Sequence, residues 1–262
     1  MDPVVAACLC FEAAKAPRPH RAPSADLISG PQIRISTMRS PFEQFPALNA
    51  IKICRHFFAQ RIPGIDVSHE KTEVLKRLDA AHREIRGATG FSDWPLFTAE
   101  QIHGNEIAVI DSYSRGPMGR EFPRCDGIIS NQRGVALGIY VADCCAVYIV
   151  DPNTPAIGLV HSGRKGTELG VVTNAISQMV ERFGSDPANM VVQLSPCIRP
   201  PHYELDFAAE IIRQCRALGV EHIHDSFTCT ACDLDRYYSY RAEKGKTGRM
   251  LAVLGLNATG GN

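Results

Sequence analysis

Three residues in the middle third of the chain have side chains that bind metal ions: His103, Cys144 and His161. Two imidazoles and one thiolate can hold a zinc ion and leave its fourth position open, as catalytic zinc sites do. A structural zinc site is normally closed by a fourth protein ligand. Because the three residues are far apart in the sequence, spacing alone also allows three separately buried polar side chains.

The residues beside Cys144 differ in what they can do. Cys144 and Cys145 lie between two apolar segments, and side chains alternate across a strand, so only one of the two thiols is expected to face a site. Asp143 can accept a hydrogen bond from the second ring nitrogen of a ligand histidine, which fixes the orientation of the ring. A turn residue that satisfies backbone amides is an equally good interpretation.

The segment that follows His161 joins a predicted strand to a predicted helix. Gly163 and Gly166 let backbone amides approach a ligand closely, and the N-terminus of a helix favours anions. Arg164 and Lys165 add positive charge beside His161. These features predict a phosphate or ribose pocket, and a tight turn with solvated basic side chains is the competing interpretation.

Two arginines near aromatic residues are further candidates for anion or nucleobase contacts. Arg61 comes shortly after Phe57 and Phe58, and Arg241 follows Tyr240 directly. The planar fork of arginine suits phosphate, and a tyrosine ring can stack on a purine. A single arginine or tyrosine more often serves surface or core packing, so these roles depend mainly on the resemblance described next.

Several short motifs follow one another along the chain in a fixed order. They are Gln101-Ile102-His103-Gly104, Ala142-Asp143-Cys144, His161-Ser162-Gly163, Pro196-Cys197-Ile198 followed by Tyr203-Glu204, Cys229-Thr230, Tyr238-Ser239-Tyr240-Arg241 and Thr247-Gly248-Arg249. As an ordered set they resemble the YfiH-type, or laccase-domain, family, historically labelled polyphenol oxidase. The resemblance covers residues 54–256.

The resemblance implies a metal site and an activity. It implies that His103, Cys144 and His161 bind zinc, with copper as a less favoured metal, and it selects Cys144 over Cys145. It also implies phosphorolysis of adenosine, inosine, guanosine and methylthioadenosine, together with deamination of adenosine. Zinc lowers the pKa of bound water to about 7, which makes hydroxide available for deamination. Phosphorolysis needs a positively charged pocket and stabilisation of an electron-deficient ribose.

The remaining site residues are predicted from residue chemistry and the resemblance together. The predicted catalytic residues are Arg61, Asp143 and Arg241. The predicted substrate-binding residues are Gln101, Arg164, Lys165 and Tyr240. The expected partners are a nucleoside and phosphate.

The chain departs from the family pattern at two positions. Where many members have Trp-Arg-Gly after the His-x-Gly motif, this chain has Arg164-Lys165-Gly166. His202 stands where many members have a cysteine. The first difference removes an aromatic surface and replaces a guanidinium by an ammonium, so it predicts a changed substrate preference with zinc binding retained.

Three other interpretations remain. Cys144 activated by His161 would be the nucleophile of a cysteine hydrolase or amidase. A fourth ligand such as His202 would close the metal site within a non-catalytic binding module. Copper-dependent phenol oxidation is least favoured, because additional His-rich copper motifs are not evident. The segment Cys229-Thr230-Ala231-Cys232 looks like a redox motif or half of a zinc site, without a second cysteine pair to complete it.

Composition narrows the class of protein. The chain has 262 residues and a formal net charge of 0, with charges mixed along the sequence, so we expect neither a nucleic-acid nor a membrane partner. Residues 1–30 lack a basic start followed by an apolar run. The ten cysteines can act as small buried hydrophobes, which favours a reducing cytoplasm.

Apolar segments and their periodicity predict the elements that position these residues. Strands are expected at residues 53–60, 96–101, 106–110, 134–141, 146–150, 156–160, 190–194 and 250–254, and helices at residues 68–87, 167–183 and 206–218. Strands adjacent in sequence predict an α+β fold with mixed β-sheets. The resemblance implies that the sheets pack together, flanked by helices, in a single compact unit. Residues 1–50 are expected to form an N-terminal extension to a laccase-like domain at residues 51–262.

Overall fold

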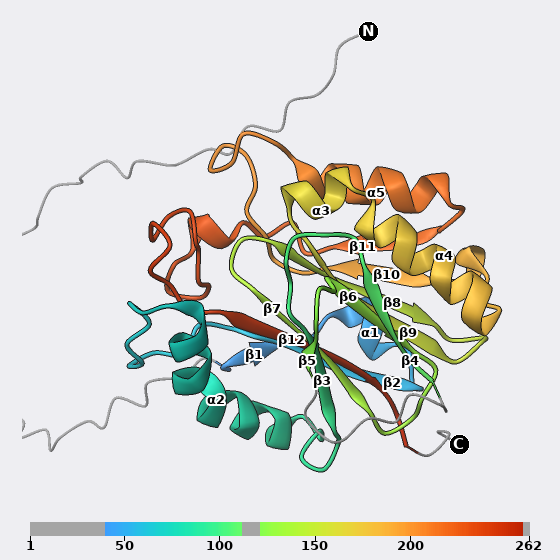
Figure 1. Ribbon diagram of the computed structural model, residues 1–262, viewed down its shortest axis with the longest axis horizontal. Coiled ribbons are helices and arrows are strands. Elements are labelled where there is room, and N and C mark those ends of the chain that lie inside the picture. Colours follow the sequence, from blue (N-terminus) through green and yellow to red (C-terminus); the bar gives the residue numbers. More distant parts are fainter. Residues whose placement is uncertain (1–39, 112–120, 259–262) are drawn as a thin grey trace, which may run out of the picture. The chain divides into compact units, whose positions relative to one another are not determined.

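The computed structural model describes residues 40–111 and 121–258, which belong to one compact unit (Figure 1). Two mixed β-sheets of six strands each pack face to face in this unit. One helix covers the outer face of the first sheet, and three helices cover the outer face of the second. The predicted α+β class, with packed mixed sheets flanked by helices, is therefore confirmed.

The first sheet is antiparallel on one side and parallel on the other. Its strands, in spatial order, are β1 (Phe42–Glu43), β2 (Cys54–Ala59), β12 (Met250–Leu256), β7 (Ala136–Val141), β3 (Leu96–Ala99) and β5 (Glu121–Phe122). Pairing is antiparallel from β1 to β7 and parallel from β7 to β5. Side chains alternate across β2, so Phe57 packs towards helix α2 (Lys71–Ala88) while Phe58 packs between the sheets.

The second sheet has an antiparallel centre and parallel edges. Its strands, in spatial order, are β11 (His222–Asp225), β10 (Val191–Leu194), β8 (Cys145–Asp151), β9 (Ala156–Ser162), β6 (Gly127–Ser130) and β4 (Ile107–Ile110). On its outer face lie α3 (Arg164–Glu168), α4 (Val171–Phe183) and α5 (Phe207–Ala217). Val147 faces these helices, and Tyr148 faces the first sheet, where its hydroxyl donates to the Phe57 carbonyl at 2.8 Å. Such a bond is needed because a buried hydroxyl without a partner is costly.

The structure differs from the expected elements at the helix over residues 167–183 and within the first fifty residues. The helix predicted at residues 167–183 is two helices, because Gly170 between α3 and α4 has φ of +69°, which suits glycine. The first short elements, β1 and α1 (Pro46–Asn49), fall inside the segment assigned to the extension. Phe45 and Leu48 are buried in the main core, so the compact unit includes these residues.

The predicted extension up to residue 39 lies outside the described residues. None of the helices within residues 40–111 and 121–258 is long and apolar enough to cross a membrane. The cytoplasmic location stays a prediction.

Candidate active site

His103, Cys144 and His161 come together at one end of the two sheets. His103 follows β3, Cys144 lies in the turn between β7 and β8, and His161 is part of β9. One ligand atom from each residue lies within 4.8 Å of the other two. The Cys144 Sγ atom is 3.9 Å from His103 Nε2, and the two imidazole rings lie edge to face with centroids 4.8 Å apart. The separately buried alternative does not hold.

This cluster fits a zinc ion. Zinc bonds of about 2.0–2.3 Å in a tetrahedral arrangement place the ligand atoms about 3.5 Å apart, so the three atoms need only small shifts. The combination of two nitrogens and one sulfur also suits copper. This donor set can hold a thiophilic transition metal, and zinc and copper are both compatible with it.

Asp126 holds two of the three ligands in place. Its carboxylate is fully buried, with Oδ1 lying 2.9 Å from His161 Nδ1. The backbone amides of His103 and Gly104 donate to the same carboxylate at 2.8 and 2.6 Å. A carboxylate on the second nitrogen of a ligand histidine fixes the ring and increases its basicity. Asp126 is thus the orienting residue of the site.

Of the two interpretations of Asp143, the structure agrees with the turn residue that accepts from a backbone amide and not with the residue that orients a histidine. Asp143 lies in the turn before Cys144 with φ of +79°, and its Oδ1 accepts a hydrogen bond from Thr230 Oγ1 at 2.7 Å. Its Oδ2 accepts from the backbone amide of Arg241 at 2.6 Å. Asp143 therefore connects two distant loops to the turn that carries Cys144. Asp126 was missed because the sequence has no local signal for it, and the pairing of β6 with β9 brings it to His161.

The electrostatics of the cluster favour a thiolate. Burial by itself raises the pKa of the Cys144 thiol, but the neighbouring His161 and His103 lower it to about 6. Burial by itself lowers the pKa of His161, but the charge of Cys144 and the bond to Asp126 raise it to about 9. Thiolate is the form of cysteine that binds metals and attacks electrophiles.

The two adjacent cysteines have the expected division of roles. Cys144 lines a cavity, whereas Cys145 is fully buried against the helices of the second sheet. Gly163, which precedes α3, lies against the thiol, and a Cβ atom added there would be 2.5 Å from Cys144 Sγ. A side chain at this position would therefore displace the Cys144 thiol, and glycine avoids this.

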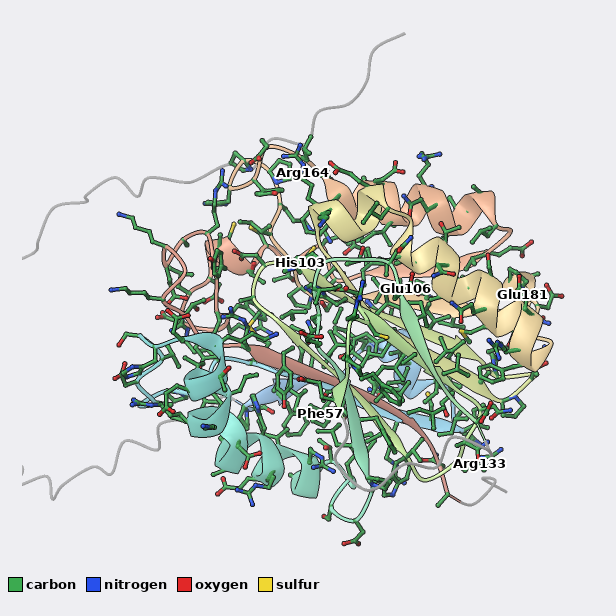
Figure 2. The ribbon with its side chains drawn as sticks, viewed as in Figure 1. Phe57, His103, Glu106, Arg133, Arg164 and Glu181 are labelled. Atoms are coloured by element: carbon green, nitrogen blue, oxygen red, sulfur yellow. The ribbon has the colours of Figure 1, made fainter. Side chains whose placement is uncertain are left out.

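A cavity of about 640 Å³ opens beside the cluster. Figure 2 labels two of its lining residues, His103 and Arg164, at the same end of the domain. Five of the predicted site residues outside the metal cluster also line it: Gln101, Asp143, Arg164, Tyr240 and Arg241. A volume of this size suits a ligand as large as a nucleoside.

Two of the predicted site residues do not line the cavity. Lys165 is exposed on α3. Arg61 lies over the Tyr238 ring at 4.4 Å and pairs with Glu243 at 2.6 Å, so it braces the loop that carries Tyr240. Gln101 does line the cavity, but both ends of its amide bind the backbone of Tyr140, at 2.6 and 2.9 Å.

Three cationic residues of the cavity were missed in the sequence: Lys71, Lys244 and Arg249. Lys71 Nζ donates to the Glu100 carbonyl at 3.0 Å, and Arg249 donates to the Thr247 and Gly248 carbonyls at 3.1 and 2.8 Å. Partial burial of its ammonium group and the nearby Arg249 charge lower the pKa of Lys71. The Thr247-Gly248-Arg249 motif was a sequence signal for Arg249, whereas nothing in the sequence sets Lys71 apart from the other polar residues of its helix.

Strained backbone is concentrated around this cavity. Six described residues other than glycine have positive φ, and four of them line the cavity: Gln101, His103, Asp143 and Lys244. Such conformations cost of order 1–3 kcal/mol each and persist at functional sites, where the surrounding structure holds them. The hydrogen bonds of Gln101, His103 and Asp143 provide that support.

The sequence of this chain is similar to a protein family and to several known proteins. The profile of the family described as multi-copper polyphenol oxidoreductase laccase matches residues 59–209 and 201–257. A purine nucleoside phosphorylase from Corynebacterium glutamicum is 32% identical over 64% of this chain and 76% of its own length. The purine nucleoside phosphorylase YlmD from Geobacillus stearothermophilus is 27% identical over 76% of this chain and 84% of its own length.

Solved structures share the fold. The protein YfiH from Bacillus licheniformis superposes with a TM-score of 0.69 at 21% identity, covering 84% of this chain and 100% of that one. YlmD from Geobacillus stearothermophilus gives a TM-score of 0.67 at 24% identity, covering 83% of this chain and 99% of that one. The chain belongs to the laccase-like family that includes the YfiH and YlmD proteins.

Proposed function

We propose that this protein is a zinc-dependent purine nucleoside phosphorylase that also deaminates adenosine. The observation that carries the proposal is the charge of the cavity wall. Among the described residues that line it, five are cationic and one is acidic, and the cationic ones are Lys71, Arg164, Arg241, Lys244 and Arg249. A positive wall beside a metal cluster suits a phosphate that must attack a bound nucleoside. Several relatives are named as purine nucleoside phosphorylases, which supports the same reaction class.

Phosphate is assigned to Lys71 and Arg249. Each donates to uncharged backbone carbonyls, and the charge of Arg249 lowers the pKa of Lys71. Two cations close together repel each other, and a phosphate between them removes that repulsion. Arg249 also has the planar fork that suits phosphate oxygens. These two residues would hold phosphate for attack on the ribose carbon as the purine leaves.

The purine is assigned to the aromatic side of the cavity. Tyr240 is 54% exposed and Tyr203 lies under the guanidinium of Arg241 at 5.4 Å, and both line the cavity. An exposed ring at a cavity mouth offers a stacking surface for a base. Arg241 is placed by its backbone bond to Asp143, so the base-binding side is tied to the turn that carries Cys144.

His103, Cys144 and His161 would hold the metal, with Asp126 keeping His161 in its binding orientation. Zinc bound there would act as a Lewis acid at neutral pH. The cysteine hydrolase alternative uses the same thiolate as nucleophile, and metal content distinguishes the two. The closed-site alternative with His202 is wrong, because His202 lies against Cys229 and Cys232 instead.

The test combines metal analysis with product analysis. Purified protein is analysed for zinc and copper, and adenosine and inosine are incubated with and without phosphate and separated by chromatography. We expect zinc, free base only with phosphate, and slower release of inosine from adenosine. Cys144→Ala should lose this metal and both activities, whereas Cys145→Ala is the matched control and should keep them. Metal-loaded protein that forms neither base nor inosine would contradict the proposal.

A further inference from the structure

A second sulfur–imidazole cluster lies outside the cavity. It consists of His202, Cys229 and Cys232, with one ligand atom from each within 4.8 Å of the others. His202 Nδ1 is 3.7 Å from Cys229 Sγ and 3.5 Å from Cys232 Sγ. None of the three is among the described residues that line the cavity. The arrangement is therefore distinct from the metal cluster of the candidate active site.

The separations match those in a tetrahedral metal site. Bonds of about 2.3 Å to sulfur and about 2.0 Å to nitrogen place neighbouring ligand atoms about 3.5–3.8 Å apart. The two cysteines form a C-x2-C pair, which is a common chelating unit in zinc sites. Cys229 precedes the short 3-10 helix Thr230–Cys232, so the turn itself aims both sulfur atoms at one point.

We propose that His202, Cys229 and Cys232 form a second metal site, which takes a thiophilic divalent cation of the zinc class. Cys229 is buried, while His202 and Cys232 are exposed, so a cation can reach the cluster from solvent. Two thiolates and one neutral imidazole neutralise the charge of a divalent cation. Three protein ligands leave the fourth position to water.

The site joins two loops that both reach the cavity. His202 directly precedes Tyr203, which lines the cavity. Thr230, between the two cysteines, donates to Asp143, which precedes Cys144. A cation at the second site therefore fixes one wall of the cavity and the turn of the first cluster together. Its role is to position these loops, and it contributes no group to the reaction.

The test is a count of metal in the full chain, which does not depend on activity. After loading with zinc and removal of excess, the wild-type chain should hold about two equivalents by elemental analysis. Cys232→Ser and His202→Asn should each hold about one, and Cys144→Ala should also hold about one. Cys125→Ser is the matched thiol control, since Cys125 belongs to neither cluster, and it should retain both equivalents.

Cobalt gives a second readout. The near-ultraviolet sulfur-to-cobalt absorption of Cys144→Ala should come from two thiolates, and that of Cys232→Ser should come from one. A Cys232→Ser chain that holds as much metal as wild type overturns the proposal. A Cys144→Ala chain that is folded by circular dichroism but holds no metal also overturns it. If the wild-type chain had no nucleoside activity, the number of metal equivalents per chain would still be measurable. The proposed activity and the proposed second metal site can therefore be disproved independently.

Discussion

The cavity has two pairs of cationic side chains that differ in their partners. Arg164 and Arg241 have half-exposed side chains, and both reach Glu204, at 3.6 and 3.2 Å. Lys71 and Arg249 make their hydrogen bonds to backbone carbonyls. Lys71 is an exposed residue, but partial burial of its ammonium end lowers its pKa, as burial does for Arg249.

The difference indicates which pair binds an anion. Carboxylate partners neutralise Arg164 and Arg241, and exposed ion pairs of this kind contribute about 0–1 kcal/mol. Lys71 and Arg249 donate to carbonyl oxygens, which carry no net charge, and the nearby charges of Glu121, Glu100 and Asp126 offset only part of the effect of burial and of Arg249 on Lys71. The following predictions test whether phosphate depends on the second pair and only weakly on the first.

The largest effect is expected for Arg249→Ala. Removing charged hydrogen bonds to phosphate costs about 1.5–3 kcal/mol, which lowers kcat/KM for phosphate by about 10–100-fold. Initial rates at varied phosphate measure it, and Arg249→Lys should recover part of the loss because it restores the charge without the fork. An unchanged KM for phosphate would remove Arg249 from the phosphate site.

Lys71→Met should come next, with a loss of about tenfold in kcat/KM for phosphate from one ammonium contact. The pH profile gives a more specific readout. Because the pKa of Lys71 is lowered, its charge and the rate should be lost at a lower alkaline pH than for an ordinary lysine. Lys71→Arg should keep the rate to higher pH, since arginine stays protonated. If the rate falls at the same alkaline pH in the wild type and in Lys71→Arg, then Lys71 does not act on phosphate.

A smaller effect on phosphate binding is expected for Glu204, whose carboxylate pairs with both Arg164 and Arg241. Glu204→Gln removes the carboxylate that Arg164 and Arg241 share, while Arg164 keeps its ion pair with Glu168, so phosphate affinity should rise by about threefold, in line with the weak ion pairs. Arg241→Ala should lower affinity by a similar factor. Isothermal titration with phosphate measures both. If Arg241→Ala weakened phosphate binding as much as Arg249→Ala does, the ranking of the two pairs would be wrong.

The smallest effect is expected where the chain departs from the family pattern. Arg164→Trp combined with Lys165→Arg should change the relative rates on different nucleosides by about threefold while the metal is retained. Lys165→Arg alone is the matched control and should change nothing, because Lys165 does not line the cavity. Equal rates across a panel of nucleosides in the double variant would place Arg164 outside the base-binding side as well.

Much of the fold could be predicted because local patterns of apolar and polar residues specify its helices and strands. The apolar runs of β7, β8 and β9 are typical of strands buried on both faces, and the amphipathic pattern of α2 predicts its helix. Short elements such as β1 and β6 were missed, although the four-residue strands β3, β4 and β10 fall inside predicted strands. Gly170 was the local sign of the break between α3 and α4.

The sequence by itself singled out His103, Cys144 and His161 as the candidate metal ligands, through their residue types and the ordered motifs around them. It also determined that one of two adjacent cysteines faces the site, because side chains alternate in extended backbone. Tertiary structure alone decided that Asp126 orients His161, since this depends on which strand pairs with β9. It also decided that Lys71 and Arg249 meet at one cavity wall and that His202 joins Cys229 and Cys232. These contacts join residues far apart in the chain, and no local pattern of hydrophobicity or charge specifies their distance in space.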